Sequence, residues 1–158
     1  MLTEDVKTVI VTLGLLAESE GILAELYEVC GSASGDAAFW GALAKQERGH
    51  SVNLKEMARL IMDANGDGFE VERRFPANAI QSFMQYVRDN LAGVRNGSIK
   101  GIKLYQLARE IERAVLDQRY PDVVKTENRP FNALMKKIIV ETEGHLRVIE
   151  ERIGEQIG

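Results

Sequence analysis

Apolar residues recur every three or four positions along four long segments of this chain, and that spacing is the period of one face of an α-helix. Alternation at every second residue, which would indicate β-strands, is almost absent. Glycine, proline and polar residues interrupt the pattern and mark where each segment ends. The sequence therefore predicts four long helices, at about Thr3–Val29, Asp36–Met62, Ser98–Arg119 and Asn128–Ile153.

The connections predict how these helices pack. Short loops join the first helix to the second and the third to the fourth, so each pair is expected to form an antiparallel hairpin. A polar connection (63–75) and an amphipathic segment from about Pro76 to Gly93 lie between the hairpins. We predict an all-α fold of one domain, residues 1–158: a four-helix bundle of two antiparallel hairpins with an extra helix in the long crossover.

Residues that favour a helix end or a turn refine these boundaries. Cys30-Gly31-Ser32 is expected to end the first helix. Ser98 and Asn128 are expected to cap the third and fourth helices, because their side-chain oxygens can accept hydrogen bonds from the first turn. Asp63-Ala64-Asn65-Gly66-Asp67-Gly68 matches the opening of a calcium-binding loop, but Arg74 stands where that loop needs glutamate. We interpret it as a polar turn, with a weak calcium site as the alternative.

Charge and cysteine content exclude several classes of protein. The net charge of −4 argues against nucleic-acid binding, which needs a basic face. One cysteine cannot form a disulfide or a cysteine zinc site within the chain. The longest apolar run, about nine residues from Val9 to Ala17, is too short to cross a bilayer. We expect a protein of the reducing cytoplasm that binds neither nucleic acid nor membrane.

Carboxylates and histidines interrupt the apolar faces near their middles. A buried, unpaired carboxylate costs several kcal/mol, and neighbouring carboxylates also repel one another. Two divalent metal ions would cancel four such charges and use two neutral imidazoles as further ligands. This oxygen-rich donor set suits iron or manganese better than structural zinc. The interrupting residues are Glu20 on the first segment, Glu47 and His50 on the second, Glu112 on the third, and Glu141 and His145 on the fourth.

The two halves of the chain also resemble each other. Glu18-Ser19-Glu20 matches Glu110-Ile111-Glu112 at an offset of 92, and the two histidines are offset by 95. Glu47 and Glu141 are offset by 94. A nearly constant offset is expected when two hairpins pack around a pseudo-twofold axis that passes through a site for two metal ions.

These motifs resemble the ferritin-like superfamily, in particular the rubrerythrin di-iron domain. The resemblance covers roughly residues 16–150, through the segments AESEGILAELY, WGALAKQERGH, AREIERAV and VETEGHLRVIEE. It implies that Fe(II) reacts with dioxygen or hydrogen peroxide, as in an oxidase, peroxidase or ferroxidase. Manganese or zinc would be possible substitutes for the two iron ions, and we expect a homodimer. It assigns metal ligation to Glu20, Glu47, His50, Glu112, Glu141 and His145, with Glu47 and Glu141 as bridging ligands.

The chain departs from the family pattern at three points. Glu141 stands four residues before His145, whereas the usual spacing is three, and Thr142 occupies that place. Val115 stands where rubrerythrins carry a further glutamate. The chain has no paired cysteines of a rubredoxin-like tail, so a separate electron-donor protein or the substrate iron is expected to supply electrons.

Other functions stay open at this point. A di-iron hydroxylase of an organic substrate would need a channel, for which Phe83, Tyr86 and Val87 of the crossover segment are candidates. Iron storage or delivery would need assembly into a cage. A structural bundle without metal is the third alternative. Tyr27 and Tyr105 fall on the same faces as Glu20 and Glu112, and they are either partners of the ligands or ordinary core tyrosines.

Overall fold

The chain folds into five α-helices and two short strands, in a computed structural model that describes residues 2–157. The all-α prediction is confirmed, and the crossover helix is present. The helices and strands are α1 (Glu4–Ser34), α2 (Ala37–Asp63), β1 (Phe69–Val71), α3 (Ala77–Arg95), α4 (Ile102–Asp117), β2 (Val124–Thr126) and α5 (Arg129–Ile157).

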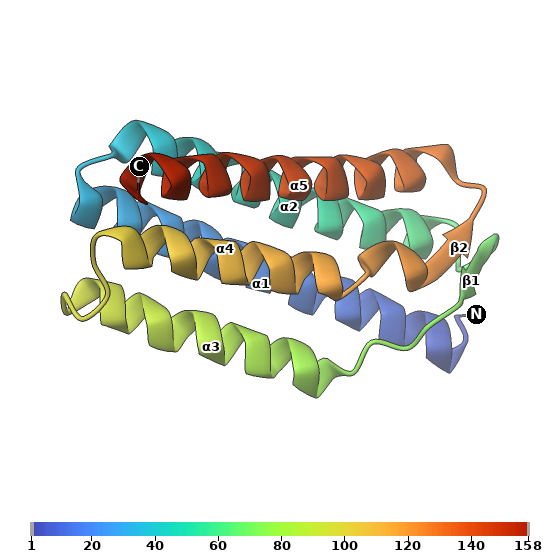
Figure 1. Ribbon diagram of the computed structural model, residues 1–158. Coiled ribbons are helices and arrows are strands. Elements are labelled where there is room, and N and C mark those ends of the chain that lie inside the picture. The colour runs from blue at the N-terminus through green and yellow to red at the C-terminus, as the bar shows by residue number, and fades with distance from the viewer. Residues whose placement is uncertain (1, 158) are drawn as a thin grey trace.

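The five helices lie alongside one another, and the direction of the chain alternates from each to the next (Figure 1). α1 packs against α2 and α4 packs against α5, each pair as an antiparallel hairpin. α2 and α5 join the two hairpins. α3 carries the chain back along the length of the molecule and packs on α1. This arrangement lets residues from α1, α2, α4 and α5 meet in one interior.

The first helix is longer than predicted. α1 continues through Cys30 and Gly31 and ends at Ser34, before Gly35, whose φ of 76° favours glycine. Gly31 lies close to α2, because a Cβ atom there would be 3.3 Å from Cβ of Trp40, a tight contact. We predicted that Gly31 would help to end the first helix, whereas it lies within the helix at a close contact with α2.

One predicted cap is confirmed and the other is wrong. Asn128 Oδ1 accepts a hydrogen bond from the backbone N–H of Phe131 at 3.0 Å, at the start of α5. Ser98 caps nothing. Its backbone N–H donates to Asn96 Oδ1 at 2.9 Å in a turn, and α4 begins at Ile102, after Gly101 with a φ of 62°.

The strands were not predicted. β1 and β2 pair antiparallel, with Glu70 opposite Lys125, and they join the start of the crossover to the connection between α4 and α5. The loop before β1 is a turn with Gly66 and Gly68 both at a φ of 79°. Asp63, the first oxygen ligand that a calcium loop would use, forms an ion pair with Arg59.

The hydrophobic core consists of two clusters with a polar layer between them. One cluster contains Leu13, Leu54 and Ile138, and the other contains Leu23 and Trp40. Between them lie buried polar side chains from α1, α2, α4 and α5. These side chains are called the polar layer below, and they are Glu20, Glu47, His50, Glu112, Thr142 and His145.

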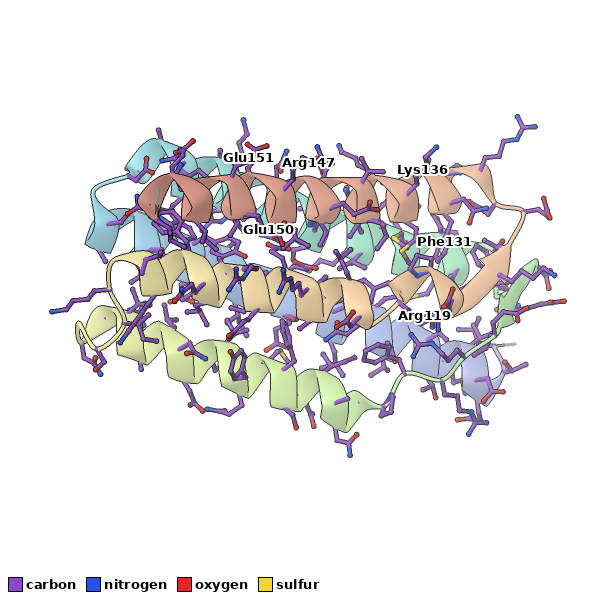
Figure 2. The ribbon with its side chains drawn as sticks, viewed as in Figure 1. Arg119, Phe131, Lys136, Arg147, Glu150 and Glu151 are labelled. Carbon is purple, nitrogen blue, oxygen red and sulfur yellow. The ribbon has the colours of Figure 1, made fainter. Side chains whose placement is uncertain are left out.

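The outer surface carries charged side chains. Figure 2 shows Lys136, Arg147 and Glu151 on the outer edge of α5, pointing away from α4. Glu150 faces α4, where its carboxylate lies 2.8 Å from Arg113. Among residues 2–157, no helix has both the length and the apolar character needed to cross a bilayer.

The packing beside the polar layer should dominate the stability of α5. We expect Ile138→Ala to lower the free energy of unfolding by about 2–5 kcal/mol, because Ile138 is fully buried. Val140→Ala, on the same helix but 55% exposed, should change it by less than about 0.5 kcal/mol. Urea denaturation followed by circular dichroism measures both. Equal losses in the two variants would contradict this account of the core.

Candidate metal centre

Five of the six predicted ligands lie together in the polar layer. Glu20 comes from α1, Glu47 and His50 from α2, Glu112 from α4 and His145 from α5, and each is at most 2% exposed. Their ligand atoms form two groups that could each hold a metal ion: Glu20, Glu47 and His50, and Glu47, Glu112 and His145. Glu47 belongs to both groups, which is the position of a bridging carboxylate.

Short contacts connect the histidines to Glu47. His50 Nδ1 lies 3.3 Å from Glu47 Oε2, and His145 Nδ1 lies 2.9 Å from Glu47 Oε1. His145 Nδ1 is also 3.4 Å from Glu112 Oε1. The two imidazole rings are stacked, with centroids 5.7 Å apart. Both rings therefore present Nδ1 to the carboxylates.

Both oxygens of Glu20 are buried next to Glu47. Among residues 2–157, no arginine, lysine, histidine or backbone N–H group donates a hydrogen bond to either of them. Burial raises the pKa of Glu20 well above its ordinary value, and the nearby charges of Glu47 and Glu112 raise it further. Burial and the neighbouring charges therefore favour the protonated form of Glu20 in the metal-free protein. A metal ion at this position would replace the proton and give these oxygens a partner.

Glu112 accepts a short hydrogen bond from the other hairpin. Tyr27 on α1 donates its hydroxyl proton to Glu112 Oε1 at 2.6 Å. Burial and the charge of Glu47 nevertheless raise the pKa of Glu112 to about 7, although contacts with His145 and Tyr27 act in the opposite direction. Tyr27 is thus a partner of a candidate ligand. Tyr105 is not, because its hydroxyl donates to Asp36 at 3.3 Å.

Glu47 carries the negative charge at the centre. Burial alone would raise the pKa of Glu47, but its interactions with Glu20, His145 and His50 outweigh burial and lower that pKa. Burial likewise favours neutral His145, but Glu112 and Glu47 outweigh it and raise the pKa of His145 to about 10. Without metal, a protonated His145 compensates Glu47. Within the part of the chain that the structure describes, no arginine or lysine forms an ion pair with Glu20, Glu47 or Glu112.

Glu141 does not join either ligand group. Its side chain is 23% exposed, and its Oε1 lies 3.2 Å from Nε2 of His50, on the outer side of that ring. Gln46 stands in the same relation to His145, because its Oε1 contacts Nε2 of that ring. We predicted that Glu141 would be a bridging ligand together with Glu47, whereas the structure places it on the outer side of His50.

The difference comes from the phase of α5. We expected Glu141 on the inward face of this helix, but the buried residues after Ile138 are Thr142, His145, Ile149 and Ile153. Thr142, at the same offset of 95 from Glu47 that relates the two histidines, occupies the inward place. Its hydroxyl donates to the backbone oxygen of Ile138 at 2.8 Å. We predicted a step of three residues, from Ile138 to Glu141, whereas the buried face takes a step of four, from Ile138 to Thr142.

Sequence reasoning missed two side chains near the polar layer. Gln46 directly precedes the predicted ligand Glu47, and the repeat could have found it, since Gln46 and Glu141 are also offset by 95. Tyr120 gave no signal, because it lies outside the long helices. Within residues 2–157 its buried hydroxyl has no hydrogen-bond partner. Burial together with the charges of Glu20, Glu47 and Glu112 raises its pKa well above the ordinary value.

A groove of about 640 Å³ runs between α2 and α5 beside the polar layer. Apolar side chains including Phe39 and Val140 form much of its wall. Gln46, Glu141 and His145 line it as well, so it reaches the outer side of the histidines. This groove is not the channel that we expected along α3. Val87 of α3 is buried in the core, and the hydroxyl of the exposed Tyr86 donates a hydrogen bond to Glu110 at 3.2 Å.

Comparisons of the chain with protein-family models, with curated proteins and with solved structures found no match. The chemistry of the site must therefore carry the functional argument. That chemistry consists of three buried carboxylates and two imidazoles, which can hold a metal ion.

The metal-free protein should lose stability as the pH rises. The pKa values of Glu112 and His145 are about 7 and about 10, above the ordinary 4.5 and 6.5, so the folded state holds more protons than the unfolded state in this range. Their stabilisation is complete at low pH and is lost as the pH rises through these values. One pKa unit is worth about 1.4 kcal/mol, so the two groups together lose about 5 kcal/mol of stabilisation between pH 6 and pH 9, and we expect the Tm to fall by about 10–20 °C over this range.

Differential scanning calorimetry in the presence of a chelator tests this. Glu112→Gln removes one of the two titrating groups and should flatten the profile between pH 6 and pH 8. A Tm of the wild-type protein that is constant or rises over this range would refute the proposed protonation of the layer.

Proposed function

We propose that the protein is a di-iron carboxylate oxidoreductase with a ferritin-like four-helix bundle, in which α1, α2, α4 and α5 form the bundle. Two iron ions would be held by Glu20, Glu47, His50, Glu112 and His145, and Fe(II) would react with dioxygen or hydrogen peroxide. The observation that carries the proposal is the pair of ligand groups that share Glu47.

Charge compensation supports binding of two ions. Three carboxylates lie in an interior where His145 is their cation and where burial favours the protonated form of Glu20. Two divalent ions would replace these protons and leave both imidazoles neutral, which is the form that ligates metal. The layer would then be stabilised by ion–ligand contacts instead of by protons held at raised pKa values.

The donor set supports iron over other metals. Carboxylate oxygens with one imidazole for each ion suit iron or manganese, and zinc is a possible substitute. When bound, a pair of Fe(II) ions supplies two electrons, enough to reduce dioxygen to hydrogen peroxide or hydrogen peroxide to water. Glu47 would hold the two ions at a fixed separation, while Leu16 and Leu23 on either side of Glu20 exclude bulk water. A separate protein would return the electrons, and we propose a homodimer.

A second candidate is a di-iron hydroxylase of an organic substrate. The groove between α2 and α5 favours it, because its volume and apolar wall are those of a small-molecule site. His145 lines this groove and also belongs to a ligand group, so a molecule bound there would lie beside the metal centre. Accelerated oxidation of Fe(II) in the presence of an apolar organic compound, with one oxygen atom incorporated into it, would favour this candidate.

Metal content and oxidation kinetics test the proposal. After anaerobic loading with Fe(II), the wild-type protein should retain about two iron ions per chain. Glu47→Ala should lose most of this iron, and His50→Ala should lose at least one ion. Glu18→Ala is the control, because Glu18 is exposed and lies near Arg88 outside the polar layer.

Mixing the loaded protein with dioxygen or hydrogen peroxide in a stopped-flow spectrometer should then produce the near-ultraviolet absorbance of Fe(III). The same iron content in all three variants would reject the ligand assignment. A wild-type chain that retains less than about one ion per two chains would indicate a structural helix assembly without metal.

A further inference from the structure

We propose that the two metal positions are chemically unequal, and that Glu141 and Gln46 set the difference as positioning residues for the two histidines. The position formed by Glu20, Glu47 and His50, here called position A, binds its metal more tightly. Position B is formed by Glu47, Glu112 and His145. This inference rests on the proposed function and assigns Glu141 a role other than metal ligation.

The geometry relates the two residues by the internal repeat. Glu141 lies four residues before His145 but contacts Nε2 of His50, and Gln46 lies four residues before His50 but contacts Nε2 of His145. Each helix therefore supplies the outer partner of the histidine on the opposite helix. The arrangement is symmetric in position and asymmetric in charge, because one partner is a carboxylate and the other is an amide.

The partner of Nε2 changes the donor strength of Nδ1. When Nδ1 binds a metal ion, the ring proton is on Nε2, and a carboxylate that accepts this proton's hydrogen bond makes the imidazole a stronger electron donor. A neutral amide oxygen does so less. His50 bonded to Glu141 is thus the stronger ligand, and His145 bonded to Gln46 is the weaker one.

The carboxylates act in the same direction. At position A, Glu20 interacts with Glu47, a ligand of the same group, and among the described residues no group outside the polar layer donates a hydrogen bond to its oxygens. At position B, Oε1 of Glu112 accepts the hydroxyl proton of Tyr27 at 2.6 Å, which withdraws negative charge from that oxygen. Position A therefore has the more basic imidazole and the less encumbered terminal carboxylate.

Exchanging glutamate and glutamine tests the inference without changing side-chain shape. Glu141 and Gln46 both line the groove between α2 and α5, so neither exchange buries a new charge in the dry centre. The four proteins compared are the wild type, Glu141→Gln, Gln46→Glu and the double exchange. Glu143→Gln is the matched control, because Glu143 is an exposed glutamate on the same helix.

Anaerobic titration of each metal-free protein with Co(II), against a competing chelator and followed by visible absorbance, gives the two dissociation constants. We expect the wild type to bind two Co(II) ions in steps that differ by at least about tenfold. Loss of an outer partner of a ligating histidine typically costs about 10–100-fold in affinity, so Glu141→Gln should weaken the first step by about 10-fold and bring the steps together. Gln46→Glu should strengthen the second step, and the control should resemble the wild type.

A second measurement separates positioning from general disturbance. In 15N-edited NMR spectra of the zinc-loaded protein, the Nε2–H proton of His50 should lie further downfield than that of His145. Glu141→Gln should move the His50 proton upfield and leave the His145 proton in place. Gln46→Glu should move the His145 proton downfield and leave the His50 proton in place.

The outcomes distinguish the two proposals. A wild-type protein that binds no metal overturns the proposed function. Two equal steps in the wild type overturn only the inequality of the positions. A Glu141→Gln variant that binds one ion instead of two overturns the outer role of Glu141, because it would then be a ligand.

Discussion

The burial of acidic side chains that no arginine or lysine in residues 2–157 compensates is the constraint on which the rest of the molecule depends. Glu20, Glu47 and Glu112 meet in the middle of the helices, where the dielectric constant is low and each unpaired charge is costly. In the metal-free chain, the pKa values of Glu20, Glu112 and His145 are all raised above the ordinary ones, which favours the protonated form of each group. Such a layer weakens the fold unless a cation occupies it, which is the physical reason to infer a metal centre.

The two apolar clusters on either side make this layer a defined site. They anchor each helix above and below the polar residues, so that side chains such as Glu47 are held by packing at both ends of their helix. Tyr27 adds a bond between hairpins, from α1 to Glu112 on α4. A centre built in this way is formed before any ion binds, and the fold bears the cost of bringing the carboxylates together.

The repeat in the chain gives the centre its approximate symmetry, and single substitutions within the repeat remove part of that symmetry. Thr142 occupies the position in the second half that corresponds to Glu47 in the first half, and it has no carboxylate. Glu47 is therefore the side chain that both ligand groups share. Glu141 and Gln46 bind the outer nitrogens of the two rings with different charge. The groove between α2 and α5 reaches this outer side, where solvent or a small molecule can approach.

The sequence by itself determined the helical class, the crossover helix and five of the clustered residues, because a period of three to four residues fixes which side chains share a helix face. It also determined that Asn128 caps α5, a local interaction within four residues. Tertiary structure decided that α1 continues past Gly31, where the helix packs closely against Trp40 of α2, a contact that the local sequence does not reveal. It also decided that Thr142, not Glu141, faces the centre: steps of three and four are equally helical, and only packing against the other helices fixes the rotation of α5.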